Sequence, residues 1–168
     1  EPMIVHVFNR AREANIANVI VAAGNIEIKE VIENVGGEAI LTNPDHASGS
    51  DRIYEALTIY DKDFSYDNVI NLQGDLPNIQ KHALTKIVSL LDSGNSDIST
   101  LGVKISSDQE ILNPNIVKAY VKNLSDNNII DDFDRTFDLS KKDFLYHHIG
   151  IYGYKRNALE AFIGLNQS

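Results

Sequence analysis

The chain has 168 residues, of which 43% are hydrophobic and 23% charged, a composition that fits one globular domain with its own core. Its formal net charge of −9 argues against a nucleic-acid partner, because proteins that neutralise phosphates are usually basic. The absence of cysteine excludes disulfides and thiolate metal sites. No apolar run reaches the roughly 18 residues of a membrane span, and no secretory signal is recognisable. We therefore expect a cytoplasmic protein that binds neither nucleic acid nor membranes.

The apolar residues alternate between helical and strand spacing over the first 105 residues. In chain order they predict a helix at 1–15, a strand at 18–23, a helix at 26–35 that ends at Gly36-Gly37, a strand at 38–42, a helix at 50–60 with Ser50 as its N-cap, a strand at 68–72, a helix at 80–91 and a strand at 97–105. This alternation favours an α/β fold in which helices cover a mostly parallel sheet.

The pattern changes after residue 105. Segments 116–122 and 128–133 flank the turn-forming cluster Ser125-Asp126-Asn127, which predicts a β-hairpin. A strand at 146–154 and a helix at 157–165 follow. We expect one domain over residues 1–168.

The start of the pattern suggests that the domain is incomplete. A nucleotide-binding α/β fold usually binds phosphates with the loop after its first strand, but the first predicted element here is a helix. Neither GxGxxG nor a Walker-type phosphate loop occurs in the sequence. We therefore expect that the first strand, its phosphate loop and a carboxy-terminal segment are missing.

Polar residues follow two of the predicted strands. Gln73-Gly74-Asp75 comes directly after the strand at 68–72, at the sheet edge where ligands bind in open α/β folds. A carboxylate at Asp75 could hold Mg²⁺, and Gln73 could hydrogen-bond a sugar hydroxyl. Asp75 could equally cap the turn before Pro77.

The segment Asp45–Arg52 follows the strand at 38–42. Its helix-terminal amides, together with Ser48 and Ser50, could bind the edge of a base, and Arg52 could pair with an anion. An ordinary helix N-cap followed by a solvated arginine would give the same sequence pattern. Lys118 could likewise reach a phosphate or be solvated.

The strand at 146–154 carries adjacent histidines. Because strand side chains alternate, His147 and His148 should not bind one metal ion together. His148, Gly150 and Tyr152 would share one face, which could be turned toward a ligand, although a plain core or edge strand shows the same pattern.

The ordered set of segments resembles the CMP-Kdo synthetases, which are 3-deoxy-manno-octulosonate (Kdo) cytidylyltransferases. The matching stretches are PMIVHV at 2–7, GGEAILT at 36–42, DHASGSDRIYEA at 45–56, VINLQGDLP at 69–77, NPNIVK at 113–118 and HIGIYGYKRNALEAF at 148–162. The resemblance implies a three-layer α/β/α, Rossmann-like fold of the nucleotide-diphospho-sugar transferase (GT-A-like) type. It also implies a homodimer, with a small hairpin and dimerisation subregion at about 106–146.

The resemblance further implies a reaction for lipopolysaccharide biosynthesis, in which CMP passes from CTP to Kdo and pyrophosphate is released. Asp75 would be a catalytic residue that binds Mg²⁺, and Gln73 a catalytic residue at the sugar. The nucleotide pocket would contain Ser48, Gly49, Ser50 and Arg52. The Kdo-binding residues would be Arg135, His148 and Tyr152.

Several family features are absent or changed. The loop PARxxSxRLPGK, the LEQLR helix and the VDTxEDL segment, which supplies a second Mg²⁺ carboxylate, do not occur. Ala23-Gly24 stands where the family usually has Thr-Asp, Leu76 replaces a glutamate, and Asp132-Phe133-Asp134 replaces Tyr-Phe-Ser before Arg135. We therefore expect the 168-residue chain alone to be nearly inactive in a turnover assay with CTP and Kdo.

Two alternatives remain at this stage. A CMP-sialic or CMP-pseudaminic acid synthetase would share the fold and the cytidine donor but use a nine-carbon acid. A non-catalytic remnant would keep the fold without binding Mg²⁺-CTP.

Overall fold

The computed structural model describes residues 1–122 and 129–165, which form two compact units. The first unit comprises Glu1–Ser99 and Ile151–Ser168, and the second comprises Thr100–Gly150. Two long strands, β4 (Ile98–Lys104) and β7 (Leu145–Lys155), run through both. The second unit contains the subregion that the sequence pattern set apart.

The first unit contains the alternating helices and strands that the sequence predicts. Its elements are α1 (Met3–Ala14), β1 (Ile20–Ala23), α2 (Ile26–Asn34), β2 (Glu38–Leu41), α3 (Gly49–Tyr60), β3 (Asn68–Asn71), α4 (Lys81–Asp92) and α6 (Arg156–Ile163). The predicted N-cap of α3 is wrong, because Ser48 occupies that position and its Oγ accepts a hydrogen bond from the Asp51 N–H at 3.2 Å.

The strands form mixed sheets, whereas the sequence favoured a mostly parallel one. β1 and β2 pair in parallel, from Ile20 opposite Glu38 to Ala23 opposite Leu41. β3 pairs antiparallel with β7, from Asn68 opposite Lys155 to Asn71 opposite Tyr152. Apolar periodicity marks a strand but not its direction, which explains the difference. In the described part of the chain, β1 and β3 each have a strand on one side only.

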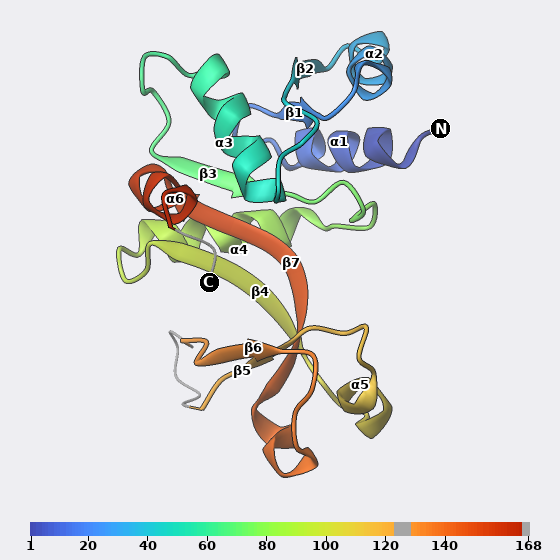
Figure 1. Ribbon diagram of the computed structural model, residues 1–168, viewed down its shortest axis with the longest axis vertical. Coiled ribbons are helices and arrows are strands. Elements are labelled where there is room, and N and C mark those ends of the chain that lie inside the picture. Colours follow the sequence, from blue (N-terminus) through green and yellow to red (C-terminus); the bar gives the residue numbers. More distant parts are fainter. Residues whose placement is uncertain (123–128, 166–168) are drawn as a thin grey trace. The chain divides into compact units, whose positions relative to one another are not determined.

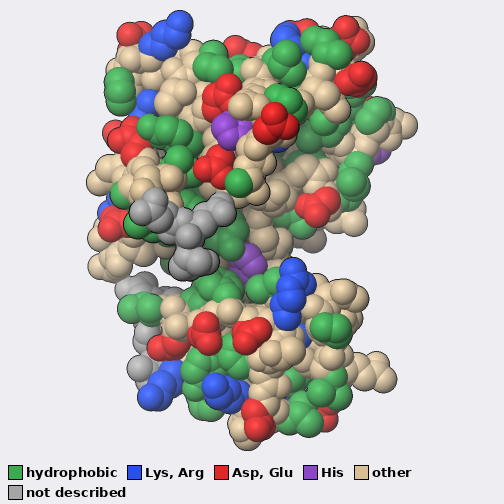
Figure 2. Space-filling model, viewed as in Figure 1, with side chains coloured by type: hydrophobic (Ala, Val, Ile, Leu, Met, Phe, Trp, Pro, Cys, Tyr) green, Lys and Arg blue, Asp and Glu red, His purple; other side chains and the backbone are tan. Residues whose placement is uncertain are grey.

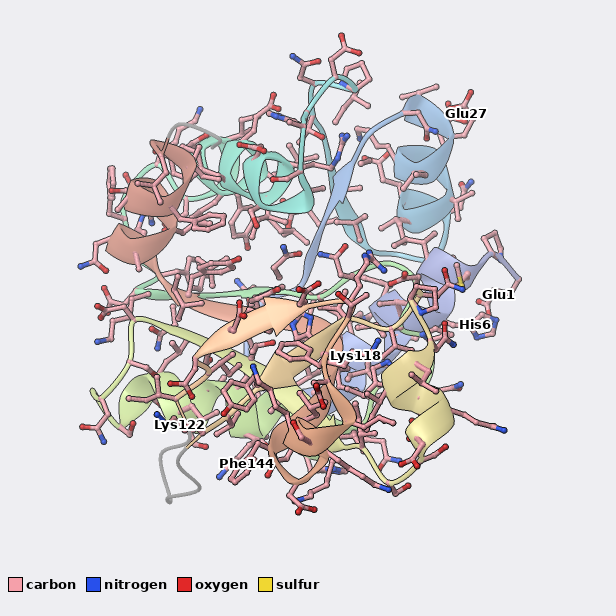
Figure 3. The ribbon with its side chains drawn as sticks, turned by 60° about the horizontal axis from the view of Figure 1, so that its bottom comes forward. Glu1, His6, Glu27, Lys118, Lys122 and Phe144 are labelled. Carbon is pink, nitrogen blue, oxygen red and sulfur yellow. The ribbon has the colours of Figure 1, made fainter. Side chains whose placement is uncertain are left out.

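Helices cover both faces of the first unit's strands. α3 packs against α6, whereas α1 packs against α2 and α4. Figure 3 shows α3 and α6 on one side of β3 and α4 on the other, and Figure 1 gives the labels. One apolar cluster is centred on Val5, Phe8 and Ile32, and another on Leu57 and Leu159. The expected three-layer α/β/α arrangement is therefore present in this unit.

Gly153 allows α4 to lie very close to β7. A Cβ atom built at Gly153 would lie 2.4 Å from Ile87 Cγ2 and 3.0 Å from Leu91 Cδ1. Real Cβ atoms do not approach so closely, and close-packed interiors relax little. The face of β7 opposite to Tyr152 and Tyr154 is therefore occupied by α4.

The second unit is small and partly irregular. Besides parts of β4 and β7 it contains α5 (Asp108–Leu112), β5 (Lys118–Tyr120), β6 (Asp132–Asp134) and the 3₁₀ helix η1 (Leu139–Phe144). β5 pairs antiparallel with β6 and with the beginning of β7. The predicted strand pairing is therefore confirmed, and the turn at Ser125-Asp126-Asn127 lies outside the described residues. The sequence analysis missed α5 and η1, which are both short.

Lys118 is fully buried in the second unit (Figure 3). Its Nζ donates hydrogen bonds to the carbonyl oxygens of Asn113, at 2.6 Å, and of Arg135. Burial lowers the pKa of Lys118, and nearby Arg135 lowers it further, while Asp134 acts in the opposite direction. Both earlier readings of this lysine are wrong, because a side chain without exposed surface is neither solvated nor available to a phosphate.

The surface carries charges of both signs. On the face shown in Figure 2, acidic and basic side chains are interspersed rather than gathered into one patch. None of the helices within residues 1–122 and 129–165 combines the length and the apolar character that a bilayer crossing requires.

Candidate active site

The carboxyl ends of β1, β2 and β3 meet at the beginning of α3. A Cβ atom at Gly24, just after β1, would lie 2.7 Å from the Arg52 guanidinium, and Arg52 Nη1 donates to Thr42 Oγ1, just after β2, at 2.8 Å. After β3, Gln73 Nε2 lies 3.2 Å from a Cβ built at Gly49. The structure therefore brings together the two polar segments that the sequence placed at this edge.

The first turn of α3 points its amide groups toward this edge. Ser48 caps the helix and donates from its Oγ to Asp51 Oδ2 at 2.5 Å. Gly49 follows without a side chain, so the space beside Gln73 is not filled from the helix. A helix N-terminus favours negatively charged ligands because its amide dipoles are aligned.

Ser50 connects the start of α3 to β7. Its Oγ lies 3.2 Å from the hydroxyl oxygen of Tyr154, and the ring of Tyr154 stacks on that of Tyr152 with centroids 6.0 Å apart. Burial raises the pKa of Tyr154 and of Tyr152, so both phenols stay protonated at neutral pH. Tyr152 is therefore linked through Tyr154 to Ser50 at the start of α3.

Asn71 supports Gln73 from within β3. Asn71 is buried, and its Oδ1 accepts a hydrogen bond from Gln73 Nε2 at 3.4 Å. A buried amide needs such a partner, since an unpaired polar group is costly to bury. The pair fixes the direction of the Gln73 side chain at the strand end.

Asp75 lies on the exposed turn after Gln73. The Leu76 N–H donates to the Gln73 carbonyl at 3.3 Å and closes the turn, and a Cβ at Gly74 would lie 3.1 Å from Ile4 Cδ1 of α1. Within the described residues, no hydrogen bond or ion pair engages the Asp75 carboxylate. Its role in metal binding stays a prediction.

Arg52 holds the loop that leads into α3. Besides Thr42, its guanidinium donates to the carbonyl oxygens of Asn43 at 3.1 Å and Pro44 at 3.2 Å. These bonds hold the main chain, a role that the sequence analysis did not foresee. A direct contact of Arg52 with the nucleotide stays a prediction.

In the second unit, His148 lies beside Thr100 and Phe133. Its Nε2 is 3.0 Å from Thr100 Oγ1, and its ring meets that of Phe133 edge to face at 5.0 Å. Burial lowers the pKa of His148, and His147 lowers it further. The neutral imidazole is therefore favoured at pH 7. The backbone at Gly150 has φ +79°, a conformation that favours glycine. A common ligand-facing side of His148 and Tyr152 stays a prediction.

We expect the second unit to lose stability in mild acid through His148. The ordinary pKa is 6.5 and the folded value is lower, so the unfolded chain binds the proton first as the pH falls. The free energy of unfolding should therefore decrease below pH 6.5, and His148→Gln should flatten this decrease. NMR titration of the imidazole together with urea unfolding at pH 7.5 and 5.5 measures both effects. A pKa of His148 at or above 6.5 in the folded protein would contradict the expected effect of burial.

Arg135 also lies in the second unit. Its side chain donates to the carbonyl oxygens of Pro114 at 3.2 Å and Asn115 at 3.3 Å. The Arg135 carbonyl oxygen accepts a hydrogen bond from Lys118 Nζ. These contacts fix the local main chain. The proposed contacts of Arg135 and His148 with the sugar stay predictions.

Sequence reasoning missed Asn71, Tyr154 and Glu55. Asn71 carried a weak signal, because Asn68 is a second amide in the same strand and only the position of Asn71 next to Gln73-Gly74-Asp75 sets it apart. Tyr154 carried none, because its contact with Ser50 joins two distant parts of the chain. Glu55, which accepts a hydrogen bond from the Asn43 N–H, carried none because it looks like any helix glutamate in the sequence. The two hollows described in the first unit, of about 690 and 490 Å³, are lined by other residues, among them Asp92 and Arg156 in one and Arg12 and Glu38 in the other.

Comparison with protein families gives one match over the whole chain. The model of the cytidylyltransferase family matches residues 1–168. A 3-deoxy-manno-octulosonate cytidylyltransferase of Brucella ovis is 44% identical over 170 aligned residues, which cover 100% of this chain and 68% of that protein. The enzyme of the same name from Bartonella bacilliformis is 43% identical, with 100% and 70% covered.

Solved structures agree with these relatives. The structure of CMP:2-keto-3-deoxy-manno-octonic acid synthetase in complex with CTP has a TM-score of 0.85 and 32% identity, and covers 100% of this chain and 69% of that chain. A 4-diphosphocytidyl-2C-methyl-D-erythritol synthase from Anaerococcus prevotii has a TM-score of 0.60 at 13% identity, covering 98% and 69%, and this likeness concerns the fold alone.

Proposed function

Because the chain belongs to the cytidylyltransferase family, among the 3-deoxy-manno-octulosonate cytidylyltransferases, it is a nucleotidyltransferase, and we propose that it transfers CMP from CTP to Kdo. One observation supports this proposal above the others. The N-terminus of α3, with Ser48, Gly49 and Ser50, lies against Gln73 at the carboxyl ends of three strands. Ligands bind at this edge in open α/β sheets.

The start of α3 is the proposed nucleotide site. Its first-turn amides and the hydroxyls of Ser48 and Ser50 offer donors and acceptors to cytosine and ribose, and Gly49 lets the ligand approach the main chain. Gln73, held by Asn71, is placed to hydrogen-bond a sugar hydroxyl. Tyr152, stacked on Tyr154, offers a ring and a protonated phenol to Kdo.

Asp75 is the residue of this site that suits Mg²⁺. Groups of three or more His, Cys, Asp or Glu side chains that could hold a metal are not found among the described residues. Mg²⁺ in nucleotide enzymes typically needs only one or two carboxylates, with phosphate oxygens and waters completing its shell. An exposed carboxylate next to the proposed nucleotide site, without a partner among the described residues, fits this pattern. When bound, the ion would neutralise phosphate charge and orient the triphosphate.

The proposed reaction is an in-line displacement. The anomeric hydroxyl oxygen of Kdo forms a bond to the α-phosphorus of CTP, the bond from that phosphorus to the bridging oxygen breaks, pyrophosphate leaves and the hydroxyl proton passes to solvent. The residues at α3 and Gln73 hold the two substrates in reach of each other. Such positioning, with electrostatic stabilisation, accounts for most of the catalysis in phosphoryl transfer.

Pyrophosphate release with CTP and Kdo tests the proposal. The assay is run on these 168 residues and on the full product of the gene, with binding of Mg²⁺-CTP measured in parallel. We expect Kdo to be preferred over nine-carbon acids such as sialic and pseudaminic acid. A preference for a nine-carbon acid would overturn the choice of sugar, and a full gene product that binds no Mg²⁺-CTP would overturn the function.

We also propose that the protein is a cytoplasmic homodimer whose contact lies in the second unit. Large apolar side chains are exposed there, including Val103, Leu112 and Leu139. Exposed apolar side chains that form one contiguous patch are typical of surfaces that a partner covers. Leu112→Asp is expected to shift the protein toward monomer in sedimentation or light-scattering measurements, whereas Leu165→Asp, in the first unit, should not. An equal effect of both variants would contradict this location.

A further inference from the structure

Two charged side chains of α3 hold the loop that leads into this helix. Arg52 donates to the carbonyl oxygens of Asn43 and Pro44. Glu55 accepts a hydrogen bond from the Asn43 N–H at 2.9 Å and pairs with His46 Nε2. Arg52 and Glu55 are three residues apart and thus neighbours on one helix face. Together they bind one main-chain donor of the loop, at Asn43, and two main-chain acceptors, at Asn43 and Pro44.

The pair of His46 and Glu55 is formed at the surface rather than in the core. The side chains are 21% and 32% exposed. The hydrogen bond from His46 lowers the pKa of Glu55, the Asn43 N–H lowers it further, and Arg52 contributes in the same direction. The carboxylate is therefore charged at neutral pH. Part-exposed polar pairs add little to global stability, so this one matters mainly for where the loop lies.

The loop determines where the nucleotide site begins. It runs directly from Asn43 to Ser48, the N-cap of α3, and Gly49 and Ser50 follow. A change at Asn43 or His46 therefore shifts the residues that are expected to meet the nucleotide. A shift of even a fraction of an ångström weakens several hydrogen bonds at once, because their strength falls steeply with geometry.

We infer that Glu55 is a positioning residue, which holds the loop from Asn43 to His46 so that the N-terminus of α3 is preformed for the nucleotide. Glu55 itself does not touch the substrate. The inference rests on the proposed function, since it assumes that the nucleotide binds at this helix end. Glu55 thereby raises the affinity for the nucleotide, although a negative charge by itself would repel the phosphates.

The test compares Glu55→Ala and Glu55→Gln with Glu33→Gln. Glu33 also forms an ion pair, with Lys29 on α2, but contacts no part of the loop. In Glu55→Ala we expect the Asn43 amide to exchange with solvent at least about tenfold faster, with the melting temperature lowered by less than about 3 °C. Glu33→Gln should change neither quantity. An unchanged Asn43 exchange rate would overturn the inference.

Nucleotide affinity provides the second readout. Glu55→Gln should raise the dissociation constant of Mg²⁺-CTP about tenfold, and it should raise KM for CTP while kcat stays nearly constant. His46→Gln should weaken binding in the same way, and the double variant should be no weaker than Glu55→Gln alone. Fully additive effects, or a fall in kcat at constant KM, would contradict positioning. If the unaltered protein bound no CTP, the proposed function would fail, and the exchange of Asn43 would still test the loop.

Discussion

In the full product of the gene, replacing Asp75 by asparagine is expected to reduce Mg²⁺-dependent pyrophosphate release by at least about 100-fold. Asparagine keeps the size and shape of the side chain but removes the negative charge that would hold the ion. Asp75 is exposed and has no protein partner among the described residues, so the substitution should not alter the fold. The melting temperature should therefore change by less than about 2 °C.

The comparison variant is Asp63→Asn, in an exposed turn of the same unit. It should leave both turnover and Mg²⁺ dependence unchanged. Raising the Mg²⁺ concentration should partly restore Asp75→Asn, because a weakened site fills at higher ligand concentration. Turnover in Asp75→Asn within about threefold of the unaltered protein, with the same Mg²⁺ requirement, would remove Asp75 from the site.

Replacing Arg156 by methionine is expected to lower the melting temperature by about 10 °C, the largest stability effect that we predict. Arg156 pairs with the buried Asp61 and donates to the Asp61 carbonyl at 3.2 Å. Its guanidinium also lies 4.2 Å from the centroid of the Phe64 ring. Removal of the arginine leaves a buried carboxylate without its cation, which is far more costly than loss of a surface pair.

The pH dependence separates this pair from simple loss of packing. Burial by itself would raise the pKa of Asp61, but hydrogen bonds from the N–H groups of Ser65 and Tyr66, and from Arg156, outweigh it and leave the pKa below its ordinary 3.8. The stabilisation is therefore complete above pH 3.8 and is lost as the pH falls through the folded pKa. Arg156→Met should lose less stability in acid than the unaltered protein does.

Lys155→Met is the matched control, because it alters the neighbouring residue in the same way. Lys155 pairs with Asp97, whose side chain is 70% exposed. Such pairs contribute little, so the melting temperature should change by less than about 2 °C. Equal changes of the melting temperature in the two methionine variants would show that the buried pair stabilises the protein no more than the exposed one.

The sequence was informative wherever a local pattern determines the structure. The helices and strands of the first unit followed from apolar spacing, and Gln73 fell at a strand end as predicted, whereas Ser48 rather than the predicted Ser50 caps α3. Strand direction was beyond reach, because β3 and β7 pair antiparallel across more than 70 intervening residues, and no local signal encodes such a pairing.

The burial of polar groups was the second feature that the sequence could not predict. Lys118 looks like any surface lysine in the sequence, yet the carbonyls of Asn113 and Arg135 surround its ammonium group. The contact between Ser50 and Tyr154 joins residues 104 positions apart. The substrate roles of the site came from family resemblance. What the structure itself shows is that the two polar segments converge at α3.

The one-sided pairing of β1 and β3 has a practical consequence for handling the protein. Within the described residues, no strand pairs with the second side of either one. Unpaired strand edges are templates on which another chain can add a strand, and β-rich aggregates grow in this way. Concentrated or partly denatured samples of these 168 residues are therefore expected to precipitate by edge-to-edge association rather than remain dispersed.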